Sequence, residues 1–204
     1  MKKIFITGGA GYVGSRLVED LVENNYDVTI FDTLYYGDKH LNHLSEKITV
    51  IKGDIRDTQL LSKSLDNHEI FLHLACISND ASFVLNEELS KSVNLDAFEP
   101  MVIEAKKKGV KRFIYASTSS VYGVSEKKDV REDHPLVPLT LYNRFKGECE
   151  PMLLKHTNEH FTGIVFRPAT VCGYSSRQRL DLSVNILTNF AVNKDKIVIF
   201  GGDQ

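Results

Sequence analysis

The chain has 204 residues, of which 42% are hydrophobic and 25% are charged, so it can bury one substantial core and begin a second layer. Its formal net charge is −2, and acids and bases are interspersed, so no basic surface typical of nucleic-acid or membrane binding is expected. The three cysteines, at widely separated positions, have neither zinc-site spacing nor the density of a disulfide scaffold. No apolar run approaches the roughly 20 residues that span a membrane. We therefore expect a cytoplasmic protein.

Strand-like and helical segments alternate along the sequence. Short runs rich in Ile, Val and Phe predict six strands, at residues 3–7, 27–31, 48–52, 70–74, 112–116 and 163–166. Helical patterns predict helices that start near residue 11 and cover residues 90–108, 141–156 and 182–192. Pro100 would kink or divide the second of these helices, and Gly109 is a C-terminal stop signal. Strands separated by helices predict the α/β class with a parallel sheet.

A glycine-rich loop, Thr7-Gly-Gly-Ala-Gly-Tyr-Val-Gly14, joins the first predicted strand to the first predicted helix. Its first glycine allows a tight turn, its third lets the backbone approach a pyrophosphate, and its last permits close packing of the helix. The N-terminus of the helix directs N–H groups toward phosphates. This context predicts a doubly wound Rossmann domain, although a glycine-rich turn without a ligand is the alternative. The expected contacts are Gly8, Gly11, Tyr12, Val13 and Gly14.

Asp32 stands about 20 residues beyond the loop, at the end of the second predicted strand. A carboxylate there would accept both adenosine ribose hydroxyls and repel a 2′-phosphate, so the expected cofactor is NAD rather than NADP. Arg16 on the first helix would act in the opposite direction by favouring a phosphate. Further cofactor contacts are expected from residues that follow the third and fourth strands, namely Asp54, at the adenine amino group, and Ile55, Leu74 and Ala75.

Tyr142 and Lys146 are four residues apart at the start of a predicted helix and so share one helix face. The fifth predicted strand ends upstream in the hydroxyl-rich run Ala116-Ser-Thr-Ser-Ser120. A tyrosine has a pKa of about 10, and a base at neutral pH needs this lowered to about 7 to 8, which a neighbouring ammonium and a positive nicotinamide can supply. Such a pair also occurs by chance on surfaces. After a glycine loop and Asp32, it predicts the catalytic pair.

With these motifs, the sequence resembles the extended short-chain dehydrogenase/reductases of the NAD-dependent epimerase/dehydratase family, the relatives of UDP-galactose 4-epimerase. The resemblance covers nearly the whole chain, and its motifs occur in family order. The segments that carry it are residues 7–14, Asp32, 53–55, 73–75, Asn94, 117–123, 142–146 and 167–169.

The resemblance implies that Tyr142 takes the proton of a sugar hydroxyl while NAD accepts hydride from the same carbon. Thr118 would hydrogen-bond the reacting oxygen, and Lys146 would bind the nicotinamide ribose and lower the tyrosine pKa. Asn94 and Pro168 would approach the cofactor. In an epimerase, the keto sugar then turns over and takes the hydride back on its other face, here expected at C4 of a nucleotide-diphosphate sugar.

The chain departs from the family pattern after the catalytic threonine. Family dehydratases, which eliminate water between sugar carbons 5 and 6, carry Asp-Glu there, whereas this chain has Ser119-Ser120, so 4,6-dehydration is not expected. Substrate contacts are expected from Ser78, Asn79, Ser119, Arg177, Arg179 and Asn185. Two alternatives stay open. Ser78 and Asn79 belong to a loop that is capped by its own side chains, and Arg177 and Arg179 are ordinary surface residues.

We expect two parts: an NAD-binding Rossmann domain over residues 1–172 and the beginning of a small substrate-binding domain over residues 173–204. The final strand-like run, at 197–200, has no following element to cover it, so the sequence is expected to be a fragment or a truncated homologue.

Three functions stay open. The first is a nucleotide-sugar epimerase, the second a NAD(P)-dependent reductase or dehydrogenase of sugar nucleotides, and the third a non-catalytic NAD-binding remnant. The resemblance also implies a homodimer built through the helices at 90–108 and 141–156. No metal site is expected, because His156 and His160 share a helical spacing but have no acid or cysteine partner with them.

Overall fold

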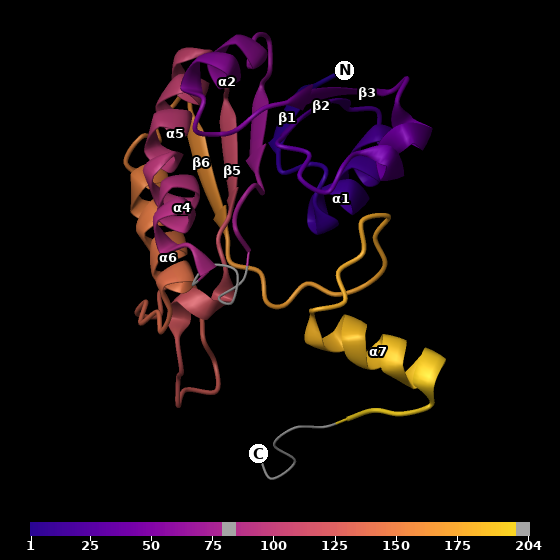
Figure 1. The fold of residues 1–204 in the computed structure, drawn as a ribbon. Helices are drawn as coiled ribbons and strands as arrows, with labels where there is room; N and C mark the ends of the chain where they lie inside the picture. The colour runs from indigo at the N-terminus through magenta and orange to yellow at the C-terminus, as the bar shows by residue number, and fades with distance from the viewer. Residues whose placement is uncertain (79–84, 199–204) are drawn as a thin grey trace.

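The computed structural model describes residues 1–78 and 85–198, and six parallel strands form one sheet in the order β3-β2-β1-β4-β5-β6 (Figure 1). The strands are β1 (Lys3–Thr7), β2 (Asp27–Asp32), β3 (Ile48–Lys52), β4 (Ile70–His73), β5 (Arg112–Ala116) and β6 (Thr162–Phe166). All six lie where the sequence predicted them. This strand order is that of a doubly wound Rossmann sheet, so the predicted fold class is confirmed.

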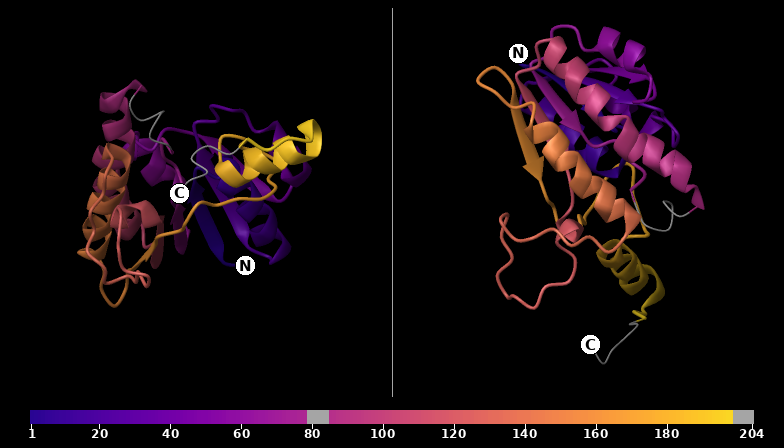
Figure 2. Two further views of the ribbon diagram at one scale, coloured as in Figure 1. Left: turned by 90° about the horizontal axis from the view of Figure 1, so that it is seen from below. Right: turned by 90° about the vertical axis from the view of Figure 1, so that its left-hand side faces the viewer.

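Helices cover both faces of the sheet (Figures 1 and 2). The helices are α1 (Tyr12–Glu23), α2 (Thr58–Ser64), α4 (Glu87–Lys91), α5 (Phe98–Lys107), α6 (Leu141–Leu154) and α7 (Ser183–Lys194). Shorter turns are η1 (Lys39–Leu44), the π-helical η2 (Ser92–Asp96) and η3 (Ser119–Tyr122). α2, α4, α5 and α6 lie on one side and α1 on the other, whereas α7 lies apart, beyond the carboxyl ends of the strands.

Two apolar cores follow from the alternation of side chains along the strands. Phe5, Phe71 and Phe113 point to the side of α5 and α6, where the rings of Phe71 and Phe113 stack at 4.5 Å. Ile4 and Ile6 point to the opposite side, into a cluster that includes residues of α1. Full burial of each such side chain contributes roughly 1.5 to 3 kcal/mol, so the cores fix the sheet between its helices.

The helix predicted at residues 90–108 is divided, as Pro100 indicated. Ala97 N donates to Ser92 O over 3.2 Å, a π-helical bond that interrupts the helix just before Pro100. A proline in the first turn of α5 needs no N–H partner, which is why α5 can start there. Gly109, at a φ of +82°, ends the helix as predicted.

Some elements differ from the sequence-based expectation. α2 and η1 were not predicted, because seven and six residues are too short for a clear periodicity, although Asp57 caps α2 by accepting from Leu60 N at 2.9 Å. The prediction of a strand at 197–200 is wrong for Ile197 and Val198, which are exposed and outside any strand. Within the described parts of the chain, no strand pairs with them. Residues 199–200 lie outside those parts. Across the two described ranges, no helix is long and apolar enough to cross a membrane.

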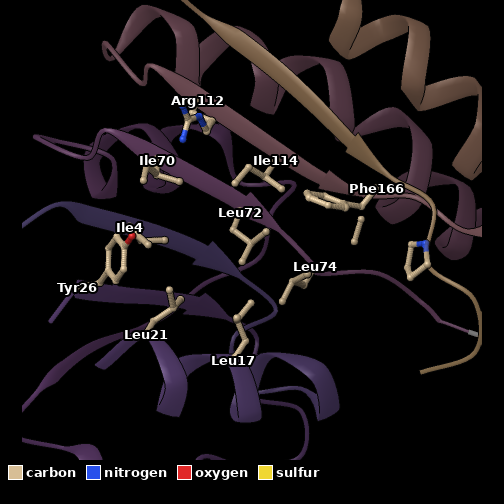
Figure 3. A pocket seen from close by; sticks show the side chains of 12 residues that line it. Ile4, Leu17, Leu21, Tyr26, Ile70, Leu72, Leu74, Arg112, Ile114 and Phe166 are labelled. Atoms are coloured by element: carbon tan, nitrogen blue, oxygen red, sulfur yellow. The ribbon is translucent and has the colours of Figure 1, made fainter. Parts of the chain in front are cut away.

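A pocket of about 460 Å³ opens on the sheet face opposite α5 and α6, beside α1 (Figure 3). Its lining is almost entirely apolar: Leu72 and Leu74 come from β4 and the loop after it, Ile114 from β5, and Leu17 and Leu21 from α1. A charged nucleotide does not suit this lining. The polar residues predicted to bind ligands lie instead at the carboxyl ends of the strands.

A buried histidine joins β1 to β4 inside the core. His73 is 4% exposed, and its Nδ1 lies 2.7 Å from the Thr7 hydroxyl. Burial, and secondarily the charge of Lys146, holds the pKa of His73 well below its ordinary value. Burial also lowers the pKa of His68. The folded protein therefore protonates both imidazoles at a lower pH than the unfolded chain does.

We expect the free energy of unfolding to fall as the pH is lowered from 7 toward 5. The unfolded chain protonates His73 near pH 6.5, whereas the folded chain does so only at lower pH, so His73 contributes a slope of up to about 1.4 kcal/mol per pH unit. Urea denaturation at several pH values measures this slope. His73→Asn should flatten it in part, because His68 remains. His160→Asn, at a side chain that is 85% exposed, should leave it unchanged; equal slopes in both variants would contradict the assignment.

Candidate active site

The glycine loop lies against the backbone that follows β4. Gly8 has a φ of +76°, and a Cβ on it would lie 2.6 Å from Ala75 N. A Cβ on Gly14 would lie 2.4 Å from Gly8 O. Side chains therefore fit at neither position, and Leu74 and Ala75 lie directly beneath the loop. The strand order reverses between β1 and β4, where open α/β sheets form their ligand crevice.

Asp32 extends from the end of β2 toward the glycine loop. One carboxylate oxygen accepts from Ala10 N at 3.1 Å, and the other accepts from Leu34 N at 2.9 Å. These bonds fix the carboxylate beside the loop, where an adenosine ribose would lie in a Rossmann fold. Arg16 pairs with Glu19 and Asp20 on the surface of α1, which compensates the charge that would favour a 2′-phosphate.

The residues after β3 have local partners. The Asp54 carboxylate accepts from Arg56 over 2.6 Å, and this bond holds its pKa below the ordinary value. An adenine amino group would share that carboxylate with Arg56. Ile55 is 5% exposed and is part of the apolar core. Val13, by contrast, is 40% exposed in the first turn of α1.

Asn94, which was expected to approach a cofactor, binds the loop beyond β4. Its Oδ1 accepts from Ile77 N and its Nδ2 donates to Ile77 O, each over 2.9 Å. The side chain is buried, with 5% of the residue exposed. Asn94 therefore fixes the backbone that forms one wall of the crevice.

Tyr142 and Lys146 come together at the start of α6. Thr140 caps this helix by accepting from Asn143 N at 3.3 Å, which sets its first turn. Lys146 is only 4% exposed, and its Nζ lies 6.0 Å from the centre of the Tyr142 ring. The same Nζ donates to Ala116 O at 2.8 Å, at the end of β5. A buried ammonium thus stands between the tyrosine and the strand end.

Thr118 lies two residues beyond that carbonyl. Its hydroxyl accepts from Ser120 N at 3.2 Å and so caps η3. Ser119 N donates to Pro168 O at 2.9 Å, which joins the loop after β5 to the loop after β6. The structure therefore places the threonine, the lysine and the tyrosine at one edge of the sheet.

A buried ion pair, which the sequence reasoning missed, ties α6 to this edge. Glu150 is 3% exposed and receives three hydrogen bonds from Arg167, the shortest being 2.6 Å. It also accepts from the Ser117 hydroxyl at 2.5 Å, while Arg167 donates to Tyr122 at 2.8 Å. The pairing raises the pKa of Arg167 above its ordinary value.

The residues predicted to bind substrate fall into two groups. Ser78 and Arg179 meet: an Arg179 N–H donates to the Ser78 hydroxyl at 2.9 Å, and Arg179 also pairs with Asp181. Arg177 lies 3.8 Å from the centre of the Tyr36 ring. Asn185 is buried, and its amide bonds Gly173 N, the Tyr12 hydroxyl and Arg179 O. Asn79 lies outside the described residues.

The structure contains no cluster suited to a metal, as far as residues 1–78 and 85–198 extend. His156 pairs instead with Glu99 over 2.9 Å. Cys149 is fully buried, and burial raises its pKa to about 12, so its thiol is not a nucleophile.

The whole arrangement matches one family. A profile of the NAD dependent epimerase/dehydratase family matches residues 4–204, and the chain belongs to this family. UDP-glucose 4-epimerase of Lactobacillus helveticus is 30% identical over 214 aligned positions, which cover 98% of this chain and 64% of that protein. The chain therefore spans less than two thirds of the length of this relative.

Two solved structures are similar over 98% of the chain and 66% of their own length. A UDP-N-acetylglucosamine 4-epimerase from Methanobrevibacter ruminantium, in complex with UDP-N-acetylmuramic acid, has a TM-score of 0.86 at 28% identity. UDP-glucose 4-epimerase from Thermotoga maritima, with UDP-glucose, has a TM-score of 0.84 at 29% identity.

We expect Glu150→Gln to lower the free energy of unfolding by about 2 kcal/mol, because it leaves the partly buried Arg167 guanidinium without its counter-charge. Urea denaturation at pH 7 measures the loss. Glu148→Gln is the matched control on the same helix, where the exposed pair with Arg144 should contribute less than about 1 kcal/mol. If the two variants lost the same stability, the buried pair would not be what fixes α6.

Proposed function

We propose that the chain binds NAD across the crevice between β1 and β4 and acts as a nucleotide-sugar 4-epimerase. The observation that carries this proposal is the position of Lys146. Its buried ammonium is held by Ala116 O next to the Tyr142 ring, at the same sheet edge as the glycine loop and Asp32. A tyrosine and an ammonium so placed suit proton transfer to and from an alcohol.

The residues present fit a dinucleotide. The close packing at Gly8 and Gly14 sets the tight turn that leads into the N-terminus of α1, which suits a pyrophosphate, and the fixed Asp32 carboxylate suits two ribose hydroxyls. NAD bound there would supply a reversible hydride acceptor. The NAD-binding domain would cover residues 1–172, and residues 173–204 would begin the substrate side.

Three side chains would carry the proton chemistry. Tyr142 would take the proton from the sugar hydroxyl and later return it. Lys146 donates one of its three N–H groups to Ala116 O, and the other two would serve a ribose hydroxyl and the tyrosine oxygen. Thr118 would hydrogen-bond the reacting oxygen. The same three groups would serve both the removal of the proton from the sugar hydroxyl and its return, as an epimerisation requires.

The substrate we propose is a UDP-hexose. The relatives described above are named for UDP-glucose and UDP-N-acetylglucosamine. Arg177 and Arg179 bring positive charge to the same edge of the sheet, which suits a diphosphate. Ser119 and Ser120 stand where a dehydratase would need an acid–base pair, so inversion at C4 is favoured over 4,6-dehydration.

We also propose a cytoplasmic homodimer. α5 and α6 pack side by side on the outside of the sheet, where Ile103 and Leu154 are about half exposed and available to a second copy. Cys76, Cys149 and Cys172 are unpaired thiols, which fits a reducing compartment.

Tyr142→Phe tests the proposal. It should bind NAD within about twofold of the unaltered chain, because the phenyl ring remains, and should lose at least about 100-fold in turnover of UDP-glucose, because the base is gone. Calorimetry measures NAD binding, and proton NMR of the sugar products measures turnover.

Tyr26→Phe, which removes a hydroxyl beside the apolar pocket of Figure 3, is the matched control and should keep full turnover. Absence of NAD binding by the unaltered chain would overturn the proposed function. Normal turnover by Tyr142→Phe would overturn the choice of base.

A further inference from the structure

Residues 173–181, which we call the strap, cross the carboxyl edge of the sheet between β6 and α7 (Figures 1 and 2). The strap contacts three loops that are far apart in sequence. It meets Tyr12 after β1, Tyr36 after β2 and Ser78 after β4. These are the loops that surround the proposed dinucleotide crevice, so the strap passes over that crevice.

The contact at Tyr12 is the most buried of the three. The Tyr12 hydroxyl donates to Gly173 O at 2.8 Å and accepts from Asn185 Nδ2 at 3.0 Å. The Ser175 hydroxyl donates to Tyr12 O at 2.7 Å. Tyr12, Ser175 and Asn185 are 8%, 3% and 7% exposed. Hydrogen bonds this well buried leave unsatisfied groups when one partner is removed.

Asn185 extends the network to both ends of the strap. Its Oδ1 accepts from Gly173 N at 3.0 Å, and its Nδ2 donates to Arg179 O at 2.9 Å as well as to Tyr12. One amide thus joins the first part of the strap, its arginine end and the glycine loop. This use of the amide argues against the direct substrate contact that we expected of Asn185 from the sequence.

The two arginines of the strap depend on that anchor. Arg177 stacks on Tyr36 with its guanidinium carbon 3.8 Å from the ring centre, and Arg179 reaches Ser78 at 2.9 Å. Both guanidiniums are carried by the short run between Ser175 and Asn185, whose ends are bonded to Tyr12. A shift of either end would move both positive charges.

We propose that Tyr12 is a positioning residue for substrate binding: with Asn185, its hydroxyl fixes the strap so that Arg177 and Arg179 present their charges to the diphosphate of a nucleotide sugar. This inference rests on the proposed function. The backbone N–H groups in the first turn of α1 would serve the cofactor, whereas the Tyr12 hydroxyl is bonded to the strap and to Asn185. One residue therefore serves both ligands through different atoms.

The test is Tyr12→Phe, which removes the hydroxyl and keeps the ring. We expect the dissociation constant for NAD to stay within about twofold. The dissociation constant for UDP-glucose, measured by calorimetry on the NAD-loaded protein, should rise about tenfold, as expected for the loss of buried hydrogen bonds. Tyr174→Phe is the matched control on the strap itself, because Tyr174 is 80% exposed, and it should change neither constant.

A double-mutant cycle and an exchange measurement complete the test. Asn185→Ala should weaken UDP-glucose binding to a similar degree, and combining it with Tyr12→Phe should add little, because both remove one network. Without any ligand, deuterium uptake over residues 173–185 should be about tenfold faster in Tyr12→Phe than in the unaltered chain.

Equal weakening of NAD and UDP-glucose binding in Tyr12→Phe would overturn the proposal, since it would indicate general damage to the loop. Unchanged UDP-glucose binding would also overturn it. If the unaltered chain bound no UDP-glucose, the proposed function would fail. The deuterium-exchange measurement would still test whether Tyr12 fixes the strap, because it needs no ligand. Unchanged uptake over residues 173–185 would show that Tyr12 does not position the strap.

Discussion

The close contact between the glycine loop and the backbone after β4 constrains the whole carboxyl edge of the sheet. Because a Cβ at Gly8 would lie 2.6 Å from Ala75 N, β1 and β4 can stay neighbours with this loop geometry only if no side chain intervenes. That approach sets the start of α1 at the reversal of strand order. Asp32 is fixed to the same loop by its hydrogen bond from Ala10 N. The Tyr12 hydroxyl, next to that loop, donates to Gly173 O and so positions the strap relative to the loop.

A second constraint fixes the position of α6. α6 is fixed to the ends of β5 and β6 by polar groups that are almost fully buried: Lys146 on Ala116 O, and Glu150 between Ser117 and Arg167. A buried polar network is stabilising only when all its members are satisfied, and it then admits few alternative positions. The hydrogen bonds that fix α6 to the strand ends therefore also determine where Tyr142 and Lys146 lie relative to the crevice.

The strands, α1 and the division at Pro100 were predictable from sequence, because periodicity, glycine spacing and a proline act over a few residues. Tyr142 and Lys146 were predictable for the same reason, since one turn of helix brings them together. The partners of Glu150 and Asn185 were not, because Arg167 and Tyr12 meet them only through the tertiary fold. A strand at 197–200 was predicted from composition, but a strand also needs a neighbour to pair with, and Ile197 and Val198 lie outside any strand.

The most direct measurement of the central claim uses UDP-glucose labelled with deuterium at C4 of the sugar. If Tyr142 and Lys146 serve a redox-neutral inversion at a crevice that retains its dinucleotide, the label will remain at C4 in both UDP-glucose and UDP-galactose. No NADH will accumulate in solution. Loss of the label to water, or one NADH released for each sugar converted, would contradict the account.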